Sequence, residues 1–345
     1  MADQRSDGRG IYKAKALLCV SIQEGEKINL EIPKVSCLDK INKVNIGDAK
    51  KAITVDGETG YPFFLFEGKA PNLPRIAFEV YDTRPEDWTA GERTLFKDVL
   101  GDPIAWAKKT VSECNAEMVC LRLVSTDPNG LNRSAEEVAE IVKEVASTVP
   151  VPLIVWGCES ADKDAGVLPK IAEVCQDRRL ILGPATDKNY KKIGAAAIAY
   201  KHTIVASTPI DINLAKQLNI LLGDLGVPDD QILIDPNIGG CSLGYGIEYT
   251  FTVMERARQA ALTQADKKLQ FPIIANFATD VWKKKEAKTT EEEDPKLGDV
   301  GKRGVLLEAL TGIVLLLAGA DILVMRHPSA IKLVRQAINN LIQNE

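Results

Sequence analysis

The chain is poor in the residues that metal and cluster sites use most. Its 345 residues include only two histidines, His202 and His327, and its seven cysteines contain no CxxC pair. These counts argue against a histidine-rich metal site and against an iron–sulfur cluster bound by this chain itself. The cysteines also form no even disulfide framework, which indicates reduced thiols and a cytoplasmic protein.

Features of nucleic-acid-binding, secreted and membrane proteins are missing as well. The net charge is -5, so no overall basic footprint for nucleic acid exists. Residues 1–10 are polar and lack the apolar core of a secretory signal. The apolar run at 305–320 is too short to span a bilayer and contains Glu308, so it predicts a buried helix of a large core. We expect a protein that binds neither nucleic acid nor a membrane.

Common nucleotide and nucleophile motifs do not occur. The sequence has no Walker A motif, no GxSxG elbow, and no GxGxxG after the first strand of its α/β region. The last absence weakens a Rossmann interpretation and leaves other α/β architectures open.

From Arg75 onward, short apolar runs alternate with segments of helical period. The strand candidates are nearly continuous apolar runs, as parallel strands buried on both faces should be. They are Ile76–Val80, Met118–Leu123, Leu153–Trp156, Leu180–Leu182, Thr203–Ala206, Gln231–Ile234, Pro272–Ala275 and Asp321–Val324. The predicted helices are Pro103–Cys114, Ala135–Thr148, Ala165–Gln176, Lys188–Tyr200, Asp211–Leu225, Gly246–Gln264, Lys302–Ala318 and Ala330–Ile342. Eight strand–helix units in about 270 residues predict an α/β protein with a TIM (β/α)8 barrel.

The N-terminal part of the chain has a different pattern. Short segments separated by turn signals predict a small β-rich unit within residues 1–70, before a barrel at 71–345. Its strand candidates are Ala16–Val20, Lys27–Ile32, Lys43–Ile46, Ala52–Val55 and Phe63–Phe66. One more segment, residues 283–299, is too polar to pack and predicts an exposed loop or lid after the seventh barrel strand.

Candidate ligand-binding residues follow the strands, because barrel ligands bind at the carboxyl ends of the strands. These positions are rich in hydroxyls, amides and glycine, and they suit a large polar ligand. The candidates are Thr126, Ala185, Thr186, Asp187, Thr208, Asp235, Asn237, Gly239, Gly240, Asn276, Phe277, Ala278, Arg326 and His327.

Some of these positions have a second interpretation. Asp235 either binds a ligand or caps the loop that follows it. The glycines at 239, 240, 244 and 246 are either turn formers or a sign that a large body lies against bare backbone. His202 precedes the fifth strand and is expected to be structural, whereas His327 follows the eighth strand and is the better functional candidate.

Three segments carry a resemblance to a known family. They are Leu-Gly-Tyr-Gly-Ile-Glu-Tyr at 243–249, Pro-Ile-Asp-Ile-Asn-Leu-Ala-Lys-Gln-Leu-Asn at 209–219, and Lys-Asp-Ala-Gly-Val-Leu at 163–168. With them the chain, from about residue 12 to its end, resembles the small subunit of the corrinoid iron–sulfur protein, the delta subunit of the acetyl-CoA decarbonylase/synthase complex.

The resemblance implies a TIM barrel that pairs with a large subunit carrying a [4Fe–4S] cluster and a corrinoid-binding domain. The cobalamin would lie between that domain and the barrel rim. The assembly would accept methyl from methyltetrahydrofolate through a methyltransferase and deliver it to acetyl-CoA synthase in the reductive acetyl-CoA pathway. No DxHxxG motif for a cobalt-ligating histidine occurs, and the family holds its corrinoid without one. The chain would thus be a non-catalytic subunit with a large apolar or neutral docking patch.

Two other functions are compatible with a barrel of this kind. A pterin-dependent methyltransferase is also a TIM barrel, and the Asp and Asn residues of the rim would suit a pterin ring. A barrel lyase or aldolase needs a Schiff-base lysine near a strand end, and none of the eight strand candidates contains lysine. The lyase therefore ranks last.

Overall fold

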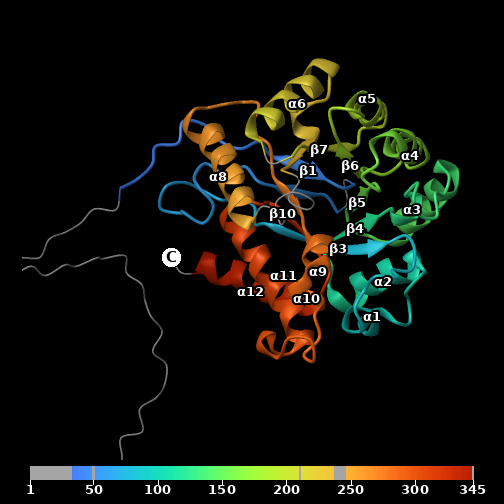
Figure 1. Cartoon of the computed structure of the whole chain (residues 1–345). Helices are drawn as coiled ribbons and strands as arrows, with labels where there is room; N and C mark the ends of the chain where they lie inside the picture. The colour runs from blue at the N-terminus through green and yellow to red at the C-terminus, as the bar shows by residue number, and fades with distance from the viewer. Residues whose placement is uncertain (1–32, 49–50, 210, 237–245, 344–345) are drawn as a thin grey trace, which may run out of the picture.

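The computed structural model describes residues 33–48, 51–209, 211–236 and 246–343, and its main body is a parallel β-barrel (Figure 1). The barrel strands are β3 (Arg75–Tyr81), β4 (Met118–Arg122), β5 (Leu153–Trp156), β6 (Ile181–Ala185), β7 (Thr203–Ser207), β8 (Ile232–Asp235), β9 (Ile274–Asn276) and β10 (Ile322–Met325). Each coincides with a predicted strand to within two or three residues at its ends, so the predicted fold class is confirmed.

The strands form one sheet in the order β8-β7-β6-β5-β4-β3-β10-β9, with every pair parallel. The two outer strands meet as well. Ile234 of β8 donates its N–H to the carbonyl of Pro272 at 2.9 Å, and Ile234 and Ile273 form a parallel bridge. This contact closes the sheet and removes its free edges.

Helices surround the barrel, as the alternating pattern predicted. They are α2 (Pro103–Cys114), α3 (Ala135–Thr148), α4 (Ala161–Val174), α5 (Tyr190–Tyr200), α6 (Ile212–Leu225), α8 (Ile247–Thr263), α11 (Val300–Leu317) and α12 (Pro328–Gln343). Local signals explain their starts. Ser134, for example, forms a capping box with Glu137 at the start of α3.

A β-hairpin closes the amino-terminal end of the barrel. Strands β1 (Val44–Ile46) and β2 (Ile53–Val55) pair antiparallel, and their apolar side chains share a buried cluster with residues inside the barrel such as Met118 and Ile322. The expected strand at Phe63–Phe66 is wrong. Phe63 has φ 61°, a left-handed conformation that interrupts an extended strand, and the segment forms turns. The segments Ala16–Val20 and Lys27–Ile32 lie outside the described residues.

Short helices fill the loops at the other end of the barrel. Helix α1 (Ala90–Phe96) follows β3 and was not predicted, although Thr89 and Glu92 form a capping box at its start. The predicted polar loop at 283–299 contains α10 (Lys285–Lys288), which follows α9 (Ala278–Lys283). Most of its side chains are exposed, as expected, but Ala287 and Thr289 are buried.

Helix α11 corrects one expectation. The apolar run 305–320 was predicted to be buried, yet Leu306, Leu310 and Leu317 are 58%, 60% and 44% exposed. The helix is apolar on nearly all sides, so its outer face remains apolar in this chain. Among the described residues, no helix combines the length and apolarity needed to cross a membrane.

One buried arginine connects the hairpin to the barrel. Arg258 of α8 lies 2.6 Å from a carboxylate oxygen of Asp56 and 2.7 Å from the carbonyl oxygen of Gly319, and it also pairs with Asp321. All of these groups are almost fully buried. Because Asp56 follows β2 and Asp321 precedes β10, a single guanidinium holds together segments that are far apart in sequence.

Removal of the Arg258 guanidinium should destabilise the fold strongly. Arg258→Met leaves the buried carboxyl groups of Asp56, Glu58 and Asp321 without a counter-charge, so the free energy of unfolding should fall by about 3–5 kcal/mol. Urea denaturation measures this change. The matched control is Arg256→Met, on the exposed side of the same helix, which should change stability by less than about 0.5 kcal/mol. Equal losses in the two variants would contradict the prediction.

Candidate functional site

A layer of polar side chains lies at the carboxyl end of the barrel. Residues i and i+2 of a strand face the same side. The polar residues of this layer each lie two positions after a residue that faces the barrel interior, so they face the barrel axis as well. The layer consists of Glu79, Arg122, Trp156, Ser207, Asp235, Asn276 and Arg326. Polar groups from seven strands therefore converge at the barrel mouth, where ligands of this fold bind.

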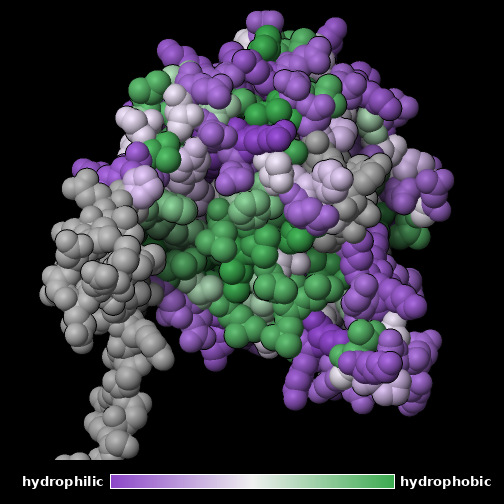
Figure 2. Space-filling model, turned by 60° about the vertical axis from the view of Figure 1, so that its left-hand side comes forward, coloured by the Kyte–Doolittle hydropathy of each residue, from purple (hydrophilic) through white to green (hydrophobic). Residues whose placement is uncertain are grey.

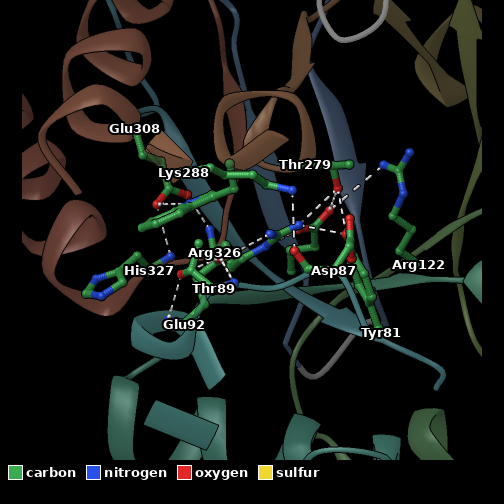
Figure 3. Close-up of polar contacts among 12 residues, drawn as sticks. Tyr81, Asp87, Thr89, Glu92, Arg122, Thr279, Lys288, Glu308, Arg326 and His327 are labelled. Carbon is green, nitrogen blue, oxygen red and sulfur yellow. Dashed lines mark hydrogen bonds and ion pairs between the residues drawn. The ribbon is translucent and has the colours of Figure 1, made fainter. Parts of the chain in front are cut away.

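One half of the mouth is a packed charge cluster around Arg326 (Figure 3). The guanidinium donates to Glu79 at 2.9 Å, to Glu92 at 2.7 Å and to the Tyr81 hydroxyl at 2.7 Å. It also lies 4.2 Å from the centre of the Trp88 ring. No space large enough for a water molecule remains among these groups in the described structure. This half is closed to ligands, and Arg326 holds β10, β3 and α1 together.

The loop after β10 is held by a buried carboxylate of α11. Glu308 accepts from the backbone N–H of Arg326 at 2.5 Å, from that of His327 at 3.1 Å and from the Trp282 indole at 3.0 Å. Burial raises the pKa of Glu308 to about 7, and these hydrogen bonds oppose the shift. The glutamate that interrupts the apolar run 305–320 therefore fixes the edge of the mouth.

The loop after β5 connects the charge cluster to the open half. Glu159 has φ 70°, and its carboxylate accepts from Arg122 at 2.7 Å and from the Trp156 indole at 3.1 Å. Asp164, fully buried, accepts the backbone N–H of Glu159 at 2.9 Å and that of Cys158 at 3.0 Å. These bonds hold Glu159 in a left-handed conformation that costs free energy on its own.

The other half of the mouth is hollow. An inner cavity of about 90 Å³ is lined by Trp156, Glu159, Ala161, Asp164, Pro184, Thr186, Asn189, Ser207, Asp235 and Asn276. Ser207 donates to the Asp235 carboxylate at 2.7 Å across neighbouring strands. Asn276 is 6% exposed, and within the described structure neither its carboxamide oxygen nor its nitrogen has a hydrogen-bond partner.

A larger outer cavity adjoins the inner one. It measures about 460 Å³, shares Glu159, Ala161, Thr186 and Ser207 with the inner cavity, and is otherwise lined by Asp187, Lys188, Thr208, Pro209, Leu214, Gln217, Leu218 and Leu221. The distinctive segment 209–219 therefore contributes Leu214, Gln217 and Leu218 to a wall of this cavity. One side is polar and the other is the apolar face of α6, which suits a ligand with both kinds of surface.

The predicted ligand-binding residues divide into four groups. Thr186, Asp187, Thr208, Asp235 and Asn276 line the cavities. Ala185, Phe277, Ala278 and Arg326 are buried in the structure around them, while Thr126 is buried and donates to the carbonyl of Leu123. His327 stacks on Trp282 with ring centres 5.7 Å apart. Asn237, Gly239 and Gly240 lie outside the described residues.

Several lining residues were not among the candidates. Ser207 ends β7 and Glu159 lies three residues after β5, so the strand-end rule places both at the barrel rim. Trp156 lies within β5, and Asp164 and Asn189 lie near helix starts, where the sequence gives no signal that they face a cavity.

A family model described as CO dehydrogenase/acetyl-CoA synthase delta subunit matches residues 43–338. The chain is similar to the acetyl-CoA decarbonylase/synthase complex subunit delta of Archaeoglobus fulgidus, at 38% identity over 87% of this chain and 66% of the relative. The delta subunit of Methanopyrus kandleri is 36% identical over 86% of this chain and 72% of its own length. The chain thus spans about two thirds of the length of these relatives.

Solved structures with a similar fold include dihydropteroate synthases. The enzyme from Thermus thermophilus has a TM-score of 0.53 at 14% identity, covering 87% of this chain and 98% of its own. The enzyme from Xanthomonas albilineans has a TM-score of 0.53 at 12% identity, covering 79% and 93%. At this identity the likeness concerns the fold alone.

His327 should remain neutral in the folded protein well below pH 6.5, and His202 should gain its proton at a lower pH than a free histidine does. Burial lowers the pKa of His327 to about 4, and it also lowers that of His202. The unfolded chain takes up these protons near pH 6.5, so the contribution of the histidines to the free energy of unfolding should decrease as the pH falls from 6.5 towards 4. With two histidines in the chain, NMR titration can follow each ring separately.

Carboxylates also titrate in this range, so His327→Gln serves as the reference. Urea unfolding gives the free energy of unfolding of both proteins at pH 7 and at pH 5. The difference between their two pH-dependent changes is the contribution of His327, and the wild-type protein should lose more stability at pH 5 than the variant does. A His327 signal that titrates at pH 6.5 would contradict the assigned environment.

Proposed function

Because the chain belongs to the CO dehydrogenase/acetyl-CoA synthase delta subunit family, we propose that it is the small subunit of a corrinoid iron–sulfur methyl carrier. Its barrel mouth covers a corrinoid held by a large subunit, which also carries a [4Fe–4S] cluster. The assembly receives methyl from methyltetrahydrofolate through a separate methyltransferase and passes it to acetyl-CoA synthase. The observation that supports this most is the family match over nearly the whole described chain.

The residues of the mouth fit such a ligand. Corrinoids carry carboxamide side chains around an apolar ring, and the two cavities offer hydroxyls, carboxylates and a buried amide on one side and the α6 leucines on the other. The unpartnered carboxamide of Asn276 is the specific sign of a missing polar partner. Thr186, Asp187, Thr208, Asp235 and Asn276 are the residues of this chain that would hold the corrinoid.

The chain acts in this proposal as a positioning subunit. When bound, the corrinoid supplies the cobalt that carries the methyl group. The buried charge cluster at Arg326 keeps one side of the mouth rigid. The hollow side hydrogen-bonds the ligand, and the outer wall of Leu214 and Leu218 shields it from water.

The surface beside α11 supports a permanent partner. Figure 2 shows a broad apolar area on the side of the molecule that carries α8, α11 and α12. The large apolar side chains exposed on these helices include Leu306, Leu310 and Leu317 of α11 and Leu333 of α12. Monomeric proteins rarely expose large contiguous apolar surfaces, and permanent complexes bury more than about 2,000 Å². We assign this apolar face to the large subunit.

Absorption spectra test the shared-cofactor proposal. The chain purified alone should be colourless, while the complex purified with its partner should show corrin bands and a broad iron–sulfur shoulder. Corrin bound by the chain alone would mean that the barrel needs no partner. A colourless complex, or tight stoichiometric binding of tetrahydrofolate by the chain alone, would instead favour a pterin-dependent methyltransferase.

Substitution of the apolar face should prevent assembly without unfolding the chain. Leu306→Asp with Leu310→Asp places two carboxylates where the large subunit packs, and both side chains are mostly exposed in the chain alone. Co-purification with the partner should be lost while the circular dichroism spectrum stays unchanged. Leu131→Asp, at a leucine that is 62% exposed in the loop before α3, is the control. Retained assembly of the double variant would refute this docking site.

A further inference from the structure

Asn276 is an anomaly among the buried polar groups of the mouth. It ends β9 and is 6% exposed, yet its carboxamide oxygen and nitrogen both lack partners in the described structure. Leaving a buried polar group unsatisfied costs about 1–3 kcal/mol. A leucine would fill the same space without that cost, so the amide is explained better by something it binds than by stability.

The other polar groups of the inner cavity are already engaged with one another. Ser207 donates to Asp235, the Trp156 indole donates to Glu159, and the Thr186 backbone donates to Asn189 at 2.7 Å. Asn276 therefore presents the cavity with one donor and one acceptor, side by side. A matching ligand group has a carbonyl next to an N–H, as in a primary carboxamide or a lactam, and forms a reciprocal pair of hydrogen bonds.

Cavity size distinguishes between the two sources of such a group. One source is a carboxamide arm at the edge of a corrinoid, and the other is the lactam edge of a pterin. An engineered cavity of about 150 Å³ accommodates a single benzene ring, and this inner cavity has only about 90 Å³. A two-ring pterin is too large to be enclosed by the inner cavity and would extend into the outer one, whereas an acetamide-sized arm fits inside entirely.

We propose that the inner cavity is the receptor for one carboxamide arm of the corrinoid, with Asn276 as the residue that recognises it. This assignment rests on the proposed function. The corrin ring itself would lie outside, over the wider outer cavity and the apolar side of α6. The arm then fixes the rotation of the ring relative to the barrel, which a flat apolar contact alone does not do.

Asn276→Leu separates binding from stability. The free chain should unfold at the same temperature or a higher one, because the variant removes an unsatisfied buried amide. The complex with its partner should bind hydroxocobalamin roughly 10- to 30-fold more weakly, as expected for two lost hydrogen bonds. Absorbance titration of the corrinoid-depleted complex measures the affinity, and Asn339→Leu, at an exposed asparagine of α12, is the matched control.

Altered ligands identify the group that enters the cavity. Hydroxocobalamin derivatives with one carboxamide hydrolysed to a carboxylate should bind the wild-type complex normally, except for one isomer. That isomer should bind more weakly, and Asn276→Leu should cause no further loss with it.

Each other outcome points to a different error. Unchanged hydroxocobalamin affinity in Asn276→Leu would overturn the arm receptor and leave the proposed function intact, with water as the occupant of the cavity. A wild-type complex that binds no corrinoid would overturn both. Tetrahydrofolate binding by the chain alone that Asn276→Leu abolishes would assign the amide to a pterin instead.

Discussion

The barrel mouth depends on the buried guanidinium of Arg326. Two carboxylates, Glu79 and Glu92, neutralise it, and the Trp88 ring covers its face. A charge this deeply buried is tolerated only with such partners, and removing one partner would leave an uncompensated charge. The cluster therefore fixes the relative positions of β3, β10 and α1, and the open half of the mouth is built against this rigid half.

The division of the mouth has a functional consequence. Arg326 engages its neighbours so fully that no room for a ligand remains beside it, whereas Asn276 is buried with no partner described. Native interiors rarely leave polar groups in that state, so the exception marks where a ligand group is expected. A rigid side and a side with unmet hydrogen bonds both suit the proposed role of a subunit that positions a cofactor.

The exposed apolar side of α11 is a second feature that the chain alone leaves incomplete. Helix α11 buries Glu308 against the loop after β10 and exposes Leu306 and Leu310 on its other side. A helix that is apolar all round is normally buried, and here the chain alone buries only half of it. Family membership as a delta subunit and this incomplete burial both support the proposed assembly with a large subunit.

The sequence by itself determined the barrel, because continuous apolar strands and intervening helical periods depend on local pattern and total count. It also located Asp235 and Asn276 at strand ends, and the Thr89–Glu92 capping box shows that it contains a local signal for α1 as well. The tertiary structure alone decided which strand-end residues are open. Arg326 and Asn276 follow the same rule in sequence, yet one is enclosed by Glu79 and Glu92 and the other faces a cavity. That difference arises from partners distant in the chain, which local pattern cannot specify.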